Sequence, residues 1–196
     1  MDFSTEAEAT REKKRWFNRH KFTTPPPEAY ASISGEITAD TVDEIADILD
    51  ADSDAPLQLS INSSGGDPIA ALQLYDMLRA HCAPTAAVVQ HRCCSAAVLP
   101  LVAADRRFAA SPNVTISVHF CAYDLHPASL ARATAQSLRD SADELSETDR
   151  ELEAILATRC RGWQSCQIRA ALEEERAMDA LGALNCGLIH EVLNNE

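Results

Sequence analysis

Apolar residues recur along the chain with two different periods, which predict alternating strands and helices. Short apolar or alternating stretches predict strands at Ala29–Ser34, Leu57–Asn62, Thr85–Gln90, Val114–His119 and Leu188–Leu193. Apolar residues on one helical face predict helices at Asp40–Leu49, Ile69–Leu78, Ala96–Ala104 and Ser165–Leu172, and a further one that Asp179 caps and that ends at Asn185. Strands and helices therefore alternate, which indicates an α/β fold with crossover connections.

The stretch Ser129–Thr158 predicts one long helix, because a thin apolar stripe runs between charged faces. A helix of about 30 residues is about 45 Å long. This is more than a small domain covers, so we expect the helix to project and meet a partner. Near the N-terminus, Pro25–Pro27 favour an extended segment. We therefore expect an N-terminal tail and proline linker over residues 1–28 and one domain over residues 29–196, with the long helix at about 128–160.

Composition narrows the classes of function. The 196 residues carry a formal net charge of −13, which repels phosphate backbones, so we expect no nucleic-acid partner. The longest uncharged apolar run, Ala96–Ala104, is shorter than the roughly 20 residues of a membrane span, so we expect no membrane partner. A charged N-terminus and seven cysteines that fit structural thiols predict a cytoplasmic location. Spacings typical of metal ligands do not occur, so we expect no metal and no cofactor.

Four polar features stand at the ends of predicted elements. The Gly65-Gly66 turn joins a strand to a helix, where it is either structural or a place for backbone N–H groups to bind a negative oxygen. Ser95 precedes a helix, either as its N-cap or as a nucleophile. His119 ends a strand, either as a hydrogen-bonded core residue or as a general base. Glu173–Glu175 close a helix, either as a solvated acidic end or as the source of a carboxylate that orients a histidine.

Taken in order, these residues resemble the ClpP-type endopeptidases, the proteolytic subunits of the ATP-dependent Clp protease. The resemblance runs from about Tyr30 to Asn194. It is carried, in chain order, by Ile61-Asn62-Ser63-Ser64-Gly65-Gly66-Asp67, Leu74-Tyr75-Asp76-Met77, Cys93-Cys94-Ser95-Ala96-Ala97, Arg107-Phe108, Pro112-Asn113, Val118-His119 and Ala183-Leu184-Asn185-Cys186-Gly187-Leu188-Ile189. It implies a ClpP/crotonase-like fold of repeated β-β-α superhelical units, in which the long helix is a projecting handle.

The resemblance also implies a role for each site residue. Ser95 would be the nucleophile and His119 the general base, while Gly65 and Ala96 would give backbone N–H groups to the oxyanion hole. The family's triad aspartate aligns with Glu175 without a gap, and a glutamate can orient a histidine. Because a glutamate is one methylene longer than an aspartate, the neighbouring acids Glu174 and Asp179 stay open as alternatives.

Several positions depart from the family's pattern. The stretch from His119 to Glu175 is longer than expected by about seven residues, or two helical turns, and the excess falls in the handle. Pro100 is expected to interrupt the helix behind the nucleophile. The remaining departures are His91 for a glycine, Ser64 for a proline, Ala96-Ala97 for Met-Gly, and Phe120 for the proline after the histidine.

The favoured function is a serine endopeptidase that cleaves unfolded polypeptides or peptides by acyl transfer inside an oligomeric chamber. The resemblance implies a homo-oligomer of heptameric rings, with the stacking of two rings left open. It also implies an AAA+ unfoldase as partner, since this sequence has no P-loop for ATP hydrolysis. The alternatives are a stand-alone or phage-type maturation peptidase of the same fold, a catalytically degenerate ring subunit, and a crotonase-like enzyme that holds a thioester oxygen.

Overall fold

The computed structural model describes residues 29–51, 53–122 and 133–193, so the tail and linker predicted over residues 1–28 lie outside the described residues. Its strands are β1 (Ala29–Ile37), β2 (Leu57–Gly66), β3 (Thr85–Cys94), β4 (Arg106–Ala109), β5 (Thr115–Ser117), β6 (Ala177–Met178) and β7 (Glu191–Val192). Its helices are α2 (Ala39–Ala51), α3 (Pro68–Ala80), the 3-10 turn η1 (Ser95–Ala97), α4 (Val98–Ala103), α6 (Ala135–Arg159), α7 (Ser165–Glu173) and α8 (Ala180–Cys186).

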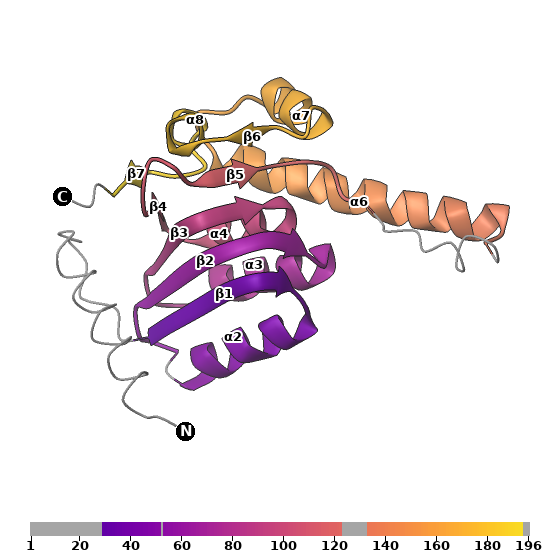
Figure 1. Cartoon of the computed structure of the whole chain (residues 1–196). Helices are drawn as coiled ribbons and strands as arrows, with labels where there is room; N and C mark the ends of the chain where they lie inside the picture. Colours follow the sequence, from indigo (N-terminus) through magenta and orange to yellow (C-terminus); the bar gives the residue numbers. More distant parts are fainter. Residues whose placement is uncertain (1–28, 52, 123–132, 194–196) are drawn as a thin grey trace.

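The strands form one sheet in the order β1-β2-β3-β4-β7, and the predicted α/β alternation is confirmed. Neighbours on this path are parallel, and β5 also pairs in parallel with the C-terminal part of β3. The two-residue strand β6 then pairs with β5 in the antiparallel direction. As a result, β2, β3, β5 and β6 lie next to one another in that order (Figure 1).

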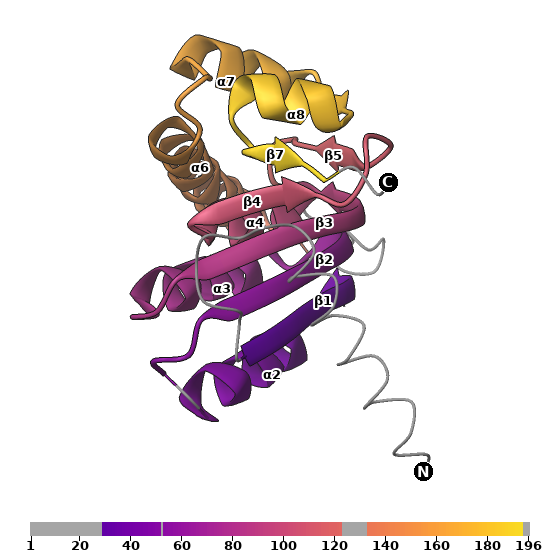
Figure 2. The ribbon, with the colours of Figure 1, turned by 90° about the vertical axis from the view of Figure 1, so that its left-hand side faces the viewer.

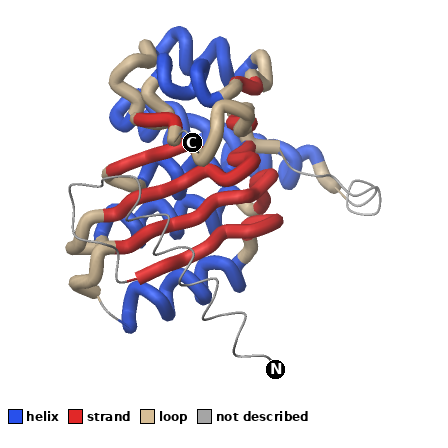
Figure 3. Tube along the Cα trace, turned by 60° about the vertical axis from the view of Figure 1, so that its left-hand side comes forward, coloured by secondary structure: helices blue, strands red, loops and turns tan. Residues whose placement is uncertain are grey.

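Helices α2, α3 and α4 cover one face of the sheet (Figure 3), as expected where helices connect parallel strands. Leu57, Leu59 and Ile61 of β2 are almost completely buried, and so is every residue of α4. Helices α7 and α8 lie above the sheet, beyond β5 (Figure 2), and β6 pairs with β5 on this side. The larger buried cluster is continuous from β1 to α8, and a smaller one, which includes Phe108, lies apart from it.

Two helix starts agree with the sequence. Asp67 caps α3 and accepts a hydrogen bond from the Ile69 N–H at 2.8 Å, with Pro68 in the first turn. Asp179 caps α8 and accepts from the Gly182 N–H at 2.8 Å. A cap of this kind typically contributes about 1 kcal/mol to stability. Both caps therefore define where a helix begins beside the candidate site.

Other boundaries differ from the prediction. Pro100 does not interrupt its helix, because Ser95–Ala97 form a separate 3-10 turn and Pro100 falls in the first turn of α4, where no intrahelical N–H is needed. The predicted strand Leu188–Leu193 is reduced to Glu191–Val192, and Val114–His119 to Thr115–Ser117. Strand β4 was missed, because Arg106 and Arg107 make it look like a polar loop.

The long helix α6 begins at Ala135, because Thr134 caps it through a capping box with Ser137. Residues 123–132, where the predicted helix started, lie outside the described residues. Its 25 residues span about 37 Å. Its buried residues, Thr148, Leu152, Ile155 and Leu156, all lie in its C-terminal half. The N-terminal half projects from the sheet, as Figure 1 shows.

Candidate active site

The predicted site residues lie at the ends of four adjacent strands. Gly65 is the second-last residue of β2, and Ser95 directly follows β3. His119 comes two residues after β5, and Glu175 two residues before β6. Because β2, β3, β5 and β6 are neighbours in this order, the four residues form a row along one edge of the sheet. This is the edge at the carboxyl ends of β2, β3 and β5, where parallel α/β sheets commonly place their sites.

Ser95 has a backbone conformation that is rare for a serine. Its φ of 55° lies in the left-handed region, whereas Cys94 before it is extended. A non-glycine residue in this region costs of order 1 kcal/mol or more and is held there by the surrounding structure. The sharp turn from β3 into η1 leaves Ser95 half-buried at the start of the 3-10 turn. A nucleophile at such a strained strand-to-helix turn is a recurrent arrangement.

Gly65 touches Ser95 across the β2–β3 boundary. A Cβ atom added at Gly65 would lie 2.6 Å from the Ser95 Cβ and 3.1 Å from its Oγ, so only a glycine fits. Gly65 also has a φ of 108°, which side-chain-bearing residues rarely adopt. The glycine turn and the serine are thus brought into direct contact, as the sequence predicted for two parts of one site.

The two predicted oxyanion donors differ in their present partners. The Gly65 N–H donates to the Ser63 Oγ at 3.0 Å, and Ser63 is fully buried. An incoming oxyanion would have to take over this hydrogen bond. Ala96 is the second residue of η1, where backbone N–H groups have no partner within the helix. Ser63 is therefore a residue of the site that the motif alone did not assign.

The imidazole of His119 is held by the next residue. Nδ1 lies 2.6 Å from the carbonyl oxygen of Phe120. A carbonyl oxygen only accepts hydrogen bonds, so Nδ1 carries the proton and donates it. In the neutral ring this tautomer leaves the lone pair on Nε2, the arrangement that a general base requires.

The register of the β5–β6 ladder points toward Glu175. In this ladder Ile116 pairs with Met178 and Ser117 with Ala177. The Val118 N–H donates to the Arg176 carbonyl at 3.0 Å, which extends the same register by one position. One further step would place Glu175 opposite His119, at the residue where the chain turns with a φ of 50°.

The two alternative acids are already engaged. Glu174 forms an ion pair with Arg176, and Asp179 caps α8. Glu175 is exposed and has a φ of 50°. The register and these commitments favour Glu175 over its neighbours.

Among the described residues, no hydrogen bond joins Ser95 to His119 or His119 to Glu175. The side chains of the proposed triad therefore lie at adjacent strand ends without being hydrogen-bonded to one another.

A carboxylate of the long helix holds the segment after His119. Asp149 of α6 accepts a hydrogen bond from the Cys121 N–H at 2.7 Å. Burial, followed by the charge and hydrogen bond of Asp149, raises the pKa of the Cys121 thiol to about 12. This contact has no signal in the sequence, because Asp149 is one of many acids in a charged helix and lies 28 residues from its partner.

Within residues 29–51, 53–122 and 133–193, histidine, cysteine, aspartate and glutamate side chains do not gather in groups of three or more that could hold a metal ion. Over the same ranges, no helix combines the length and apolar character needed to cross a membrane.

Comparison with known proteins agrees with this fold. The model of the Clp protease family matches residues 28–196, so the chain belongs to the Clp protease family and is a ClpP-type peptidase. Among solved structures, a point mutant of ClpP1 from Listeria monocytogenes superposes with a TM-score of 0.70, at 21% sequence identity, over 86% of this chain and 92% of that one. At this identity the match shows the fold, which is that of ClpP. The predicted family and fold are thereby confirmed.

Proposed function

We propose that this chain is a serine endopeptidase in which Ser95 is the nucleophile, His119 the general base and Glu175 the acid that orients His119. The observation that carries the proposal is the row Gly65, Ser95, His119 and Glu175 along adjacent strand ends, with Gly65 in contact with Ser95. Such a row supplies an anion-binding turn, a nucleophile, a base and an acid in the order in which acyl transfer needs them.

The proposed reaction uses the free lone pair of His119. Nε2 takes the proton of the Ser95 hydroxyl as Oγ attacks the carbonyl carbon of a peptide bond. The Gly65 and Ala96 N–H groups would stabilise the oxyanion, each by about 2.7–4 kcal/mol. The proton then passes from Nε2 to the leaving amine, and a water molecule repeats the sequence to release the acyl group.

The proposed setting is a cytoplasmic homo-oligomer that cleaves unfolded polypeptides in an enclosed chamber, fed by an ATP-driven unfoldase. Support comes from the family and from α6, whose exposed N-terminal half extends beyond the sheet as a surface for another subunit. Heptameric rings and their stacking belong to the same proposal. Native mass spectrometry of the purified protein tests the subunit number.

Labelling with a fluorophosphonate tests the nucleophile. The Ser95 Oγ would form a bond to phosphorus while the phosphorus–fluorine bond breaks and fluoride leaves. We expect the wild type to be labelled and Ser95→Ala to remain unlabelled. Ser111→Ala is a matched control, since Ser111 is a half-buried serine in a turn whose Oγ only accepts from the Asn113 N–H. Labelling that persists in Ser95→Ala would show that another residue is the nucleophile.

The same labelling experiment separates the alternatives. An assembled wild-type protein that takes no label would be a degenerate ring subunit. Casein digestion by the purified protein without any ATPase would instead favour a stand-alone maturation peptidase.

A further inference from the structure

A cavity of about 460 Å³ lies at the end of the sheet opposite to Ser95. Its walls come from the start of β4, the end of α6 and the loop before β7, and include Arg107, Arg159 and Arg161. Strand β3 separates this cavity from the candidate active site, and a ten-residue strand is about 33 Å long. The cavity therefore lies well apart from the candidate active site.

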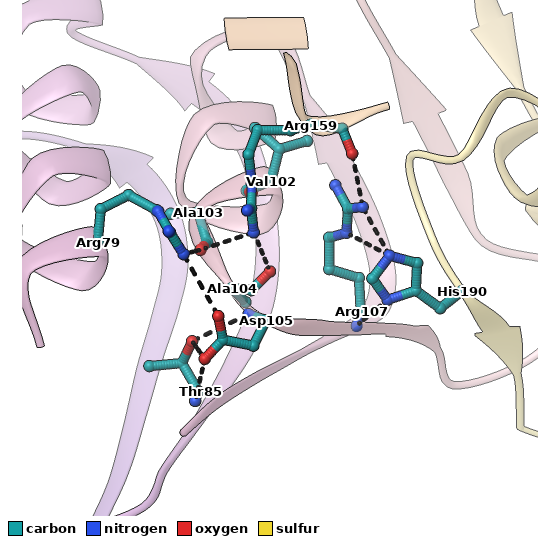
Figure 4. A network of polar contacts seen from close by, with 9 residues as sticks. All are labelled: Arg79, Thr85, Val102, Ala103, Ala104, Asp105, Arg107, Arg159 and His190. Atoms are coloured by element: carbon teal, nitrogen blue, oxygen red, sulfur yellow. Dashed lines mark hydrogen bonds and ion pairs between the residues drawn. The ribbon is translucent and has the colours of Figure 1, made fainter. Parts of the chain in front are cut away.

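Arg107 brings a buried positive charge to this cavity. Only 3% of the residue is exposed. Its Nε donates to the Nε2 of His190 at 3.2 Å, and its Nη2 donates to the Arg159 carbonyl at 2.9 Å, as Figure 4 shows. Its Nη1 is closed to solvent and has no hydrogen-bond partner. Arg107 therefore contributes a fixed positive charge beside the cavity rather than an open donor.

Arg159 is fixed beside it by the end of α4. Its Nε donates to the Val102 carbonyl at 2.7 Å, and its Nη2 to the carbonyls of Ala103 and Ala104 at 3.3 and 2.9 Å (Figure 4). These bonds use two of its three nitrogens and hold the guanidinium in place. The third nitrogen of Arg159, Nη1, makes no hydrogen bond to any described residue. A guanidinium held in this way is preorganised to bind an anion, because it loses little side-chain entropy on binding.

Nothing described around the cavity neutralises these charges. Asp105, the one acidic residue that lines it, already accepts from the Thr85 N–H at 3.0 Å and Oγ1 at 3.2 Å and pairs with Arg79. Burial raises the pKa of the neighbouring Cys160 thiol to about 11, so this thiol is neutral. Arg161 is exposed and forms no ion pair with the described acids. The lining thus has three arginines against one occupied carboxylate, in a chain whose net charge is −13.

We propose that this cavity binds an oxyanion of the phosphate class, with Arg159 and Arg161 as its ligands and Arg107 as a fixed positive charge behind them. The Nη1 of Arg159 and the exposed guanidinium of Arg161 would donate to its oxygens. Charge-assisted bonds from several arginines are the usual recognition of phosphate. The lining has no aromatic side chain other than the imidazole of His190, so nothing there is built to stack a nucleotide base. The ligand is therefore the phosphate group itself.

Titration with inorganic phosphate, followed by calorimetry at constant ionic strength, tests the proposal. We expect saturable binding by the wild type, weakened about tenfold in Arg161→Ala because one charge-assisted ligand is lost. Arg150→Ala is the matched control, since Arg150 is an exposed arginine of α6 outside the cavity and without an ion pair to the described acids, and it should bind like the wild type. Adenosine monophosphate in a parallel titration distinguishes free phosphate from a nucleotide, and we expect it to bind no more tightly than phosphate.

A second readout reports from inside the cavity. A bound anion stabilises the protonated imidazole, so phosphate should raise the pKa of His190, followed by NMR, in the wild type and not in Arg107→Gln. Absence of phosphate binding by the wild type would overturn the proposal. Equal weakening in Arg161→Ala and Arg150→Ala would overturn it as well, because the effect would then be one of net charge alone.

Discussion

Nδ1 of His119 lies 2.6 Å from the carbonyl oxygen of Phe120. A backbone carbonyl therefore fixes the tautomer of this imidazole, the task usually given to the acid of a catalytic triad. Continuing the β5–β6 register beyond its last pair would place Glu175 opposite His119, but Glu175 is exposed and its carboxylate makes no hydrogen bond to the ring. Phe120 and Glu175 therefore contribute unequally to the orientation of the His119 ring.

We therefore predict unequal effects of removing the proposed base and the proposed acid. His119→Ala should abolish peptide cleavage, with a loss of about 10³-fold or more, because no other described group at this position can take the Ser95 proton. Glu175→Gln should lower kcat/KM by only about tenfold, since the Phe120 carbonyl still holds the ring in the correct tautomer. Steady-state hydrolysis of a fluorogenic peptide measures both. A Glu175→Gln variant as inactive as His119→Ala would mean that the carboxylate alone orients the ring during catalysis.

The contact between Gly65 and Ser95 gives a second prediction. Gly65→Ala places a Cβ atom 2.6 Å from the Ser95 Cβ, which forces the serine or the glycine turn to move. We expect fluorophosphonate labelling to be lost. Gly35→Ala is a matched control, because Gly35 has a similar positive φ of 86° but no atom within 4 Å of an added Cβ.

Both glycine variants should lose about 1–2 kcal/mol of stability from the left-handed backbone conformation. Circular dichroism should show that both variants are still folded. Only Gly65→Ala should lose fluorophosphonate labelling. If Gly35→Ala lost labelling to the same extent, backbone strain rather than contact with Ser95 would be the cause.

Asp149 gives a third prediction, about a residue that acts through the backbone. Its carboxylate accepts from the Cys121 N–H and so fixes the segment that carries His119. Asp149→Ala removes this acceptor and should lower kcat/KM by about tenfold, whereas Asp149→Asn keeps an acceptor oxygen and should retain most of the activity. A merely structural role would make both variants equally harmful.

The Cys121 thiol provides an independent readout of the same contact. Asp149 raises its pKa, together with burial. Asp149→Asn removes the negative charge, so the pKa of Cys121 should fall and its alkylation by iodoacetamide at neutral pH should become faster. An unchanged alkylation rate would mean that Asp149 does not act on this segment.

The order of elements was enough to predict that Gly65, Ser95 and His119 lie at or beside the carboxyl ends of neighbouring strands. Parallel strands have their carboxyl ends at one edge, so the order of elements already fixes which residues can meet. Glu175 needed the strand register as well, because β6 has only two residues and leaves no periodic pattern in the sequence. The sequence therefore left Glu174 and Asp179 open, and the ladder with β5 favours Glu175.

Contacts made by the backbone could not be predicted in this way. The Phe120 carbonyl and the Cys121 N–H bond to a ring and a carboxylate whose positions depend on the path of the chain after β5, not on residue type. The burial of Arg107 could not be predicted for a related reason. An arginine in the sequence is expected at the surface. The carbonyl of Arg159 and the imidazole of His190, which hold the Arg107 side chain in the interior, lie more than 50 residues away in the chain.

His190 gives the last prediction, on the pH dependence of stability. Burial first, and then the positive charges of Arg107, Arg106 and Arg159, lower the pKa of His190 from its ordinary 6.5 to about 4. The unfolded chain therefore binds a proton at a pH where the folded protein does not, so stability falls as the pH decreases from about 6.5 to about 4. Above this window His190 is neutral in both states and has no effect. His190→Gln keeps an oxygen to accept from Arg107 and removes the titration, so its unfolding midpoint in urea should fall less than that of the wild type across the same window. Carboxylates titrate equally in both proteins and cancel in this comparison, so identical slopes in the two proteins would show that His190 is protonated as easily in the folded state as in the unfolded one.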